Sequence, residues 1–200
     1  MMKRFSLVRL QRVFTYALCA LLILLCSSEM VAAEDDWAVT VYGARFTDSV
    51  IARTLRFSAD FVDSYLLAIA VERRIATFKK HIDFEVEVQA VKHFGDQHHL
   101  EFNGLIIARW LTFPWDKYIN TSFAVGEGIS YATEVPELER LYHRGEKQIL
   151  NYLLFEITLS CPNLPKWSLV ARSHHRSNAY GLFAEHGGSN SMGLGVKYSF

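Results

Sequence analysis

The last ten residues of the chain alternate strictly between two kinds of side chain. From Ser191 to Phe200, every even position is apolar and every odd position is serine, glycine or lysine. Side chains two residues apart lie on the same face of a β-strand, so this pattern predicts a strand with one apolar face. Such a strand must lie between an apolar and a polar environment, which limits the folds open to the chain.

The same alternation recurs through the rest of the sequence. We expect eight strands, at residues 37–46, 65–75, 82–93, 99–112, 119–131, 148–160, 166–176 and 189–200. After residue 33 no segment has the roughly 20 continuous apolar residues of a helical span, and a closed barrel is the other way to cross a bilayer. A terminal aromatic residue on an alternating strand is typical of bacterial outer-membrane barrels, whereas an amphipathic strand in a soluble sandwich is the alternative. The sequence therefore predicts an all-β fold, an eight-stranded antiparallel transmembrane β-barrel of the outer membrane.

The predicted connections have the asymmetry of such a barrel. Those after the second, fourth and sixth strands are short, whereas residues 47–64 and 132–147 form longer connections on the other side. Short periplasmic turns and longer external loops are the expected arrangement. Aromatic residues cluster at the expected periplasmic ends, as an interfacial girdle would. These are Trp37, Trp110, Phe113, Trp115, Tyr118, Trp167 and Phe200.

The first 33 residues are typical of an export signal. Four basic residues come first, an apolar run follows over residues 14–26, and Val31-Ala32-Ala33 fits the small-residue cleavage pattern. We expect residues 1–33 to be a signal peptide and residues 34–200 to be one outer-membrane β-barrel domain of a Gram-negative cell. An uncleaved membrane anchor is the alternative, although an apolar run of 13 residues is short for a span.

Charge and cysteine content exclude several classes of function. The chain carries 21 basic and 21 acidic side chains, and cleavage would remove four basic residues and Glu29, which leaves a net charge of −3. That charge gives no electrostatic case for nucleic acid. Only Cys161 would remain, so no intramolecular disulfide could form, and no Cys/His spacing suggests zinc. His98 and His99 would face opposite sides of a strand and make a poor ligand pair. We expect no cofactor and no metal.

Charged residues fall on the probable inward faces of the strands. Glu85, Glu87, Glu101 and Arg172 are the clearest cases. Eight strands enclose an interior that side chains can fill, so these groups could form a hydrogen-bonded plug. They also argue against a periplasmic lipocalin-like barrel with a lipid inside. The face of Glu127 cannot be assigned from alternation.

The seventh predicted strand carries the residues that suggest chemistry. Trp167, Leu169 and Ala171 make its odd face apolar, so that face should contact lipid, and His175 and Ser177 continue it to the external end. A base beside a hydroxyl nucleophile, followed by the amide of Asn178, matches what a serine esterase needs. An ester within a membrane lipid would suit this placement. Basic residues of the other face, His174 and Arg176, are candidates to contact lipid phosphates.

In architecture and motif, the chain resembles the lipid A 3-O-deacylases of the PagL type. The resemblance rests on the signal peptide, the strand count, the run His175-Arg-Ser-Asn-Ala179 and the terminal strand Gly188–Phe200. It implies that Ser177 is the nucleophile, His175 the general base and Asn178 a stabiliser of the oxyanion. The implied substrate is lipid A, or lipopolysaccharide, among the outer-membrane lipids, and the product is its ester-linked 3-hydroxyacyl chain.

The sequence departs from that family at the third member of the triad. The family has a glutamate at the start of the last strand, where this chain aligns Asn190. An amide can orient an imidazole but cannot stabilise its charged form as a carboxylate does. Glu185 is a possible substitute, and a site without a third member is the remaining possibility. Tyr180 is also inserted before Gly181, relative to the Asn-Ala-Gly order of the family.

Other functions remain open. A catalytically weak or inactive barrel with a structural or lipid-binding role is the main alternative, and Asn190 supports it. Residues 128–132, Gly-Ile-Ser-Tyr-Ala, approximate the Gly-x-Ser-x-Gly esterase motif. That motif needs a strand-turn-helix elbow in an α/β sheet, which the β pattern here does not offer. Acyl-chain preference, latency in the native membrane and oligomeric state are not determined by the sequence.

Overall fold

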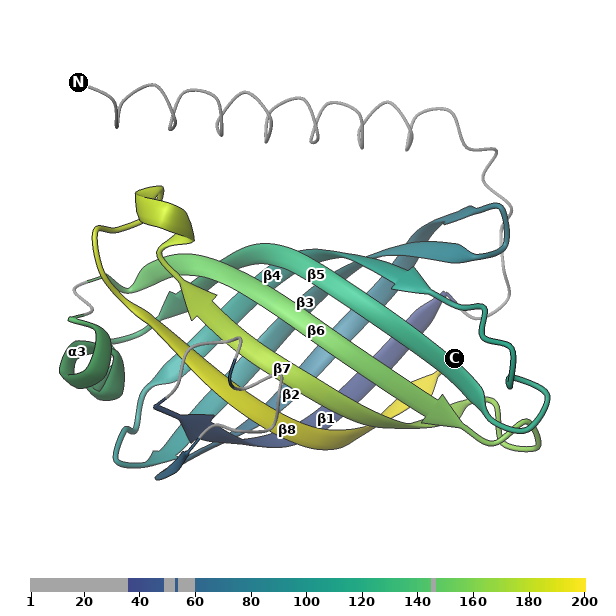
Figure 1. Ribbon diagram of the computed structural model, residues 1–200, viewed down its shortest axis with the longest axis horizontal. Coiled ribbons are helices and arrows are strands. Elements are labelled where there is room, and N and C mark those ends of the chain that lie inside the picture. Colours follow the sequence, from purple (N-terminus) through teal and green to yellow (C-terminus); the bar gives the residue numbers. More distant parts are fainter. Residues whose placement is uncertain (1–35, 49–52, 54–59, 145–146) are drawn as a thin grey trace.

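The computed structural model describes residues 36–48, 53, 60–144 and 147–200. The predicted signal peptide, residues 1–33, lies outside this part of the chain. Eight strands form one closed antiparallel barrel in which each strand pairs with its sequence neighbours and β8 closes on β1 (Figure 1). The strands are β1 (Trp37–Thr47), β2 (Phe61–Phe78), β3 (Ile82–Gly95), β4 (Leu100–Trp110), β5 (Asn120–Ala132), β6 (Ile149–Ser160), β7 (Trp167–Ser177) and β8 (Gly188–Ser199). The structure thus confirms the predicted fold class.

All eight predicted strands are present, but β2 is longer than predicted. The alternation predicts that this strand begins at residue 65, after a loop over residues 47–64, whereas β2 begins at Phe61. In the structure Ser64 pairs with Gly95 of β3, and Asp63 accepts a hydrogen bond from Arg45 of β1 at 2.9 Å. A register shift between Arg74 and Ala76 carries β2 on to Phe78. Pairing across strands therefore outweighs the local loop-like composition.

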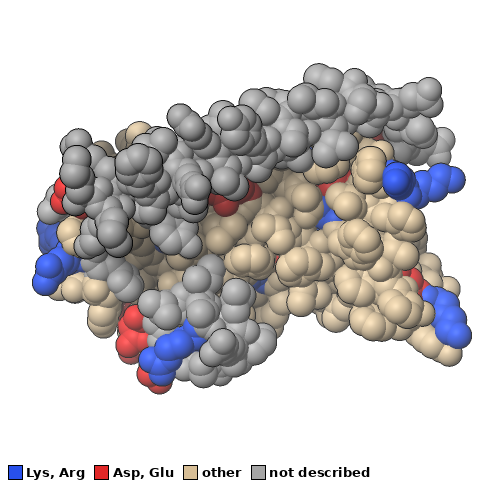
Figure 2. Space-filling model, turned by 45° about the horizontal axis from the view of Figure 1, so that its top comes forward, with Lys and Arg blue, Asp and Glu red and all other residues tan. Residues whose placement is uncertain are grey.

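The barrel has an apolar outside and a charged inside. Val88 and Leu169 point outward with 63% and 65% of their surface exposed, whereas Glu87 and Arg172 point inward and are buried. On the face shown in Figure 2, charged side chains gather mainly toward the two ends, and most of the wall between them is uncharged. This is the polarity of a barrel whose outer wall faces lipid.

No helix in the described part of the chain is long and apolar enough to cross a membrane.

The two ends of the barrel differ in their connections. Trp37 and Phe200 are joined by backbone hydrogen bonds, and the connections 79–81, 111–119 and 161–166 lie at the same end as these residues. The opposite end carries helix α3 (Glu137–His143) and the 3₁₀ turn η1 (Ala179–Gly181), both at the left-hand end of the barrel in Figure 1. In the predicted orientation, which puts the chain ends in the periplasm, α3 and η1 are at the external end.

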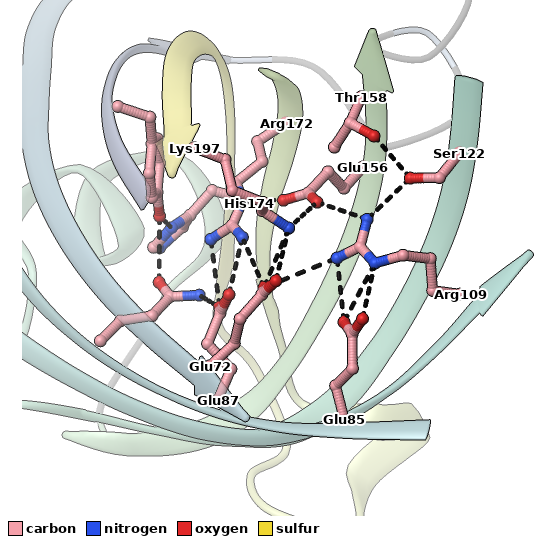
Figure 3. A network of polar contacts seen from close by, with 12 residues as sticks. Glu72, Glu85, Glu87, Arg109, Ser122, Glu156, Thr158, Arg172, His174 and Lys197 are labelled. Carbon is pink, nitrogen blue, oxygen red and sulfur yellow. Dashed lines mark hydrogen bonds and ion pairs between the residues drawn. The ribbon is translucent and has the colours of Figure 1, made fainter. Parts of the chain in front are cut away.

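Charged side chains fill the interior, as the inward positions predicted (Figure 3). The carboxylates are Glu72, Glu85, Glu87 and Glu156, and the cations are Arg109, Arg172 and Lys197. Glu156 contacts all three cations, at 2.8 Å from both Arg109 and Lys197 and with a hydrogen bond from Arg172 Nε, and Glu72 lies 2.8–4.0 Å from the same three. These contacts join β2, β3, β4, β6, β7 and β8 across the lumen. The described interior is thus a polar plug at this level.

The lipid-facing wall leads to a first prediction. Val88 lies near the middle of β3, so Val88→Arg would place a charge at the bilayer midplane. We expect this change to lower the free energy of unfolding by about 2–4 kcal/mol. Leu169 lies near the periplasmic end of β7, so Leu169→Arg should lower it by only about 0–1 kcal/mol. Urea unfolding in lipid vesicles measures both. Equal costs at the two positions would contradict the assigned depth of the barrel.

Candidate active site on the outer wall at β7 and β8

His175 and Ser177 lie on the outward face of β7 at its external end. They follow Leu169 and Ala171 on the same face. The alternating residues Arg172, His174 and Arg176 point into the barrel and are buried. In the register with β8, His175 is opposite Asn190 and Ser177 is opposite Gly188. Both side chains are half-buried, so neighbouring residues shield them in part while they remain accessible from the membrane side.

Asn190 contacts the candidate base directly. Its Oδ1 lies 2.6 Å from His175 Nδ1, and the Asn190 side chain is buried. An amide oxygen can only accept, so Nδ1 carries the proton of this hydrogen bond. In the neutral ring, Nε2 then holds the lone pair that a general base requires. The residue aligned with the family's acid therefore orients the imidazole without adding a negative charge.

Asn178 and its neighbours form a compact turn after Ser177. The side-chain amide of Asn178 donates to the carbonyl oxygen of Glu185 at 3.0 Å, and Gly181 N donates to the carbonyl of Asn178 at 3.1 Å. Ala179 has a φ of 47°, and its N–H reaches Ser177 Oγ at 3.4 Å. The Asn178 amide, the predicted oxyanion donor, and the neighbouring Gly181 N–H thus each have a partner within the turn. Glu185 is exposed in the same turn, while the hydrogen bond to His175 comes from Asn190.

Gly188 keeps the start of β8 close to Ser177. Its φ is 139°, which side-chain-bearing residues rarely adopt, and an added Cβ would lie 2.8 Å from the carbonyl oxygen of Arg176. The chain can therefore bring β8 into register beside Ser177 only with glycine at this position. This close approach also sets the position of Asn190, two residues later.

Sequence reasoning missed two polar residues on the same outer wall. Asn151 of β6 is directly opposite Ser177, and directly opposite residues have Cβ atoms about 4.5–5.5 Å apart. Its side chain hydrogen-bonds to Glu127 of β5, which lies on the outward face between Val125 and Ile129. The unassigned face of Glu127 is now settled as the lipid-facing one. A single asparagine among Ile149, Leu153, Phe155, Ile157 and Leu159 was the signal available in the sequence.

Helix α3 holds the two strands of the site together at the external mouth of the barrel. Glu139 of α3 lies 3.1 Å from Arg176, the residue between His175 and Ser177, and accepts a hydrogen bond from Ser189, next to Asn190, at 2.8 Å. Burial raises the pKa of Glu139, and the nearby positive charge of Arg176 opposes that rise. One carboxylate thus ties the external ends of β7 and β8 together.

The suggestion that His174 and Arg176 contact lipid phosphates is wrong. Both side chains are buried inside the barrel, with only 2% and 1% of their surface exposed. His174 Nε2 lies 2.9 Å from Glu101, and Arg176 pairs with Glu139. The even positions of β7 face the lumen along its whole length, so neither side chain can reach a headgroup.

Comparisons with known proteins agree with the architecture. No family model matches the sequence, and no curated protein matches it. Among solved structures, the chain is similar to the outer membrane enzyme PagL, with a TM-score of 0.53, 14% identity, and coverage of 80% of this chain and 98% of that one.

Two other outer-membrane barrels are also similar to the chain. Neisserial surface protein A has a TM-score of 0.49 at 11% identity, over 82% of this chain and 97% of that one. Ail, the attachment invasion locus protein of Yersinia pestis, has a TM-score of 0.44 at 11% identity, over 85% of this chain and 100% of that one. At these identities the comparisons show the fold alone: the chain is an eight-stranded barrel of the outer-membrane type.

Proposed function

We propose that the chain is a serine esterase of the lipid A 3-O-deacylase type, which removes an ester-linked 3-hydroxyacyl chain from lipid A in the outer leaflet. The observation that carries this proposal is the hydrogen bond from His175 to Asn190 on the lipid-facing wall, with Ser177 next on the same face. An oriented base beside a hydroxyl, turned toward lipid, suits an ester buried at the membrane boundary better than a soluble one.

In each half of the reaction His175 would take up one proton and return it, first from Ser177 to the sugar oxygen and then from water to Ser177. Ser177 Oγ attacks the ester carbonyl carbon, and its proton passes to His175 Nε2. The tetrahedral intermediate collapses, the bond to the sugar oxygen breaks, and that oxygen takes the proton from His175. A water molecule then attacks the acyl-serine with His175 again as base, which releases the 3-hydroxy fatty acid and restores Ser177.

Amide donors beside Ser177 would stabilise the negative oxygen of the intermediate. Asn178 follows Ser177 directly, and Asn151 faces it across β6. Their amide groups now bond to the Glu185 carbonyl and to Glu127, respectively. Each amide has a second N–H, and one donor placed at the developing charge contributes on the order of 3 kcal/mol. No metal is needed for these steps.

Release of free 3-hydroxy fatty acid from purified lipid A tests the proposal. The barrel would be refolded in detergent micelles, mixed with lipid A, and the released acid measured by gas chromatography and mass spectrometry. We expect one 3-hydroxy acid to appear, with the acyl groups carried on other hydroxyls left in place. A fully folded barrel that releases no acid would contradict the proposal. It would support the second candidate, a barrel with a structural or lipid-binding role, which is also suggested by the amide at position 190.

Asn190→Glu is expected to raise the rate of release by about tenfold or more. A carboxylate at this position would keep the orientation of His175 and also stabilise the imidazolium that forms during attack. Asn190→Ala should lower the rate, because it removes the partner of Nδ1, and Glu185→Gln should leave it unchanged. Initial rates under one detergent condition compare the variants. Unchanged rates in both position-190 variants would show that Asn190 does not act on His175.

A further inference from the structure

A second group of titratable side chains lies inside the external mouth of the barrel, away from His175 and Ser177. His93 is near the end of β3, His99 is in the connection between β3 and β4, and Glu101 is the second residue of β4. All three are buried, with 5%, 4% and 0% of their surface exposed. One nitrogen or carboxylate oxygen from each lies within 4.8 Å of the others. They form a compact set of two imidazoles and one carboxylate.

The register of β3 and β4 creates this cluster. Lys92 pairs with Leu100, and His93 N donates to the carbonyl of His99 at 3.1 Å, so the two histidines face each other across the turn. Their rings stack with centroids 4.1 Å apart. Glu101 is the next inward residue after His99, whereas His98 points outward and is exposed. The spacing His-x₅-His-x-Glu brings the ligands together only once this hairpin has formed.

Two atoms, one in the cluster and one beside it, lack a hydrogen-bond partner within the described residues. His99 Nε2 and Gln97 Oε1 are both buried and unpaired there. A buried polar atom without a partner costs about 1–3 kcal/mol, so each calls for an explanation. A ligand between the two histidines would supply the partner that His99 lacks.

The surrounding groups orient the cluster as the outer shell of a metal site does. Oε1 of Glu101 accepts hydrogen bonds from His174 and Ser130, both at 2.9 Å, which leaves Oε2 facing His93 Nε2 at 3.0 Å. His93 Nδ1 lies 3.2 Å from the amide of Gln97. A histidine that binds metal through Nε2 needs an acceptor for Nδ1–H, and rotation of the Gln97 amide would present its unpaired Oε1 there.

We propose that His93, His99 and Glu101 bind a divalent cation of the zinc class at the external mouth of the barrel. Two imidazoles and one carboxylate suit Zn²⁺, with water as the fourth ligand, and do not suit Mg²⁺ or Ca²⁺, which prefer oxygen ligands alone. On binding, the proton of the neutral His93 ring moves from Nε2 to Nδ1, where Gln97 Oε1 can accept it, and a bond to the metal replaces the hydrogen bond from Nε2 to Glu101. Arg176, the nearby cation, is paired with Glu139 at 3.1 Å.

Zinc titration of the purified, chelator-treated barrel in detergent tests this site without reference to lipid A. Competition with a chromophoric chelator should show one Zn²⁺ per chain and no binding of Mg²⁺ or Ca²⁺. His99→Ala should weaken zinc binding by about 10–100-fold or more, since loss of even an outer-shell partner has that effect. His98→Ala is the matched control and should bind as the wild type does. Equal loss in the two variants would overturn the assignment.

X-ray absorption at the zinc edge gives a second measurement that needs no variant. The wild-type barrel should show two imidazole ligands and additional oxygen ligands at about 2.0–2.2 Å. Absence of saturable binding, or a sulfur ligand from Cys161 in place of the imidazoles, would reject the site. Because neither measurement uses an ester, a barrel without deacylase activity could still bind zinc, and the two proposals fail separately.

Discussion

Ser177→Ala is expected to reduce release of the 3-hydroxyacyl chain by on the order of 10³-fold or more. The hydroxyl is the attacking group in the proposed reaction, and its loss leaves only binding and oxyanion stabilisation. His175→Ala should have an effect of similar size, because the two residues act as one unit. For the same reason the double variant should be no slower than either single variant. Single-turnover release of 3-hydroxy acid from lipid A in micelles measures all three.

Ser173→Ala is the matched control for this prediction. Ser173 lies on the same outward face of β7, two residues before His175 as Ser177 lies two residues after it. Its hydroxyl is opposite Met192 of β8, away from Asn190 and the turn that follows Ser177. We expect release close to that of the wild type. Loss of activity in Ser173→Ala, together with full activity in Ser177→Ala, would show that Ser177 is not the nucleophile.

Arg172→Met is expected to lower the free energy of unfolding by about 3–5 kcal/mol. Arg172 is fully buried, pairs with Glu87 at 2.7 Å and with Glu156, and its guanidinium lies 5.0 Å from the Tyr42 ring centroid. Methionine would keep much of the volume but leave Glu87 without the cation that pairs with it, while Glu156 keeps Arg109 and Lys197. The cost of such a variant comes mainly from the charges left unpaired.

Equilibrium unfolding in urea, in vesicles of one lipid, measures this cost. Arg45→Met provides the control, because Arg45 pairs with Asp63 at 2.9 Å where both side chains are largely exposed. An exposed pair contributes about 0–1 kcal/mol, so this variant should unfold near the wild-type midpoint. A loss in Arg172→Met no larger than that in Arg45→Met would contradict the central role of the interior network.

Alternation along single strands was enough to predict most of the fold. Period-two patterns identified all eight strands, and the odd positions of β7 correctly placed His175 and Ser177 on the lipid-facing wall. The same pattern placed Glu87 and Arg172 inside, where they form an ion pair. These features depend on which face a residue occupies, and face is encoded locally.

Contacts between strands were harder to predict, because register depends on loops and on the closure of the barrel. The alignment placed Asn190 near His175, but the position of Asn151 opposite Ser177 follows only from the register of β6 with β7. The packing of α3 into the mouth depends on contacts of Glu139 with Arg176 and Ser189, which lie far away along the chain. His93, His99 and Glu101 likewise meet only when the β3–β4 hairpin has formed.

Mass spectrometry of lipid A from a Gram-negative host tests the central claim most directly. Cells that carry the folded barrel in the outer membrane would be compared with cells that carry Ser177→Ala at the same level. We predict that lipid A from the first cells loses the mass of one 3-hydroxyacyl chain from position 3, and that lipid A from the second cells keeps it. Identical lipid A in both, with the wild-type barrel folded at the surface, would contradict the proposed activity.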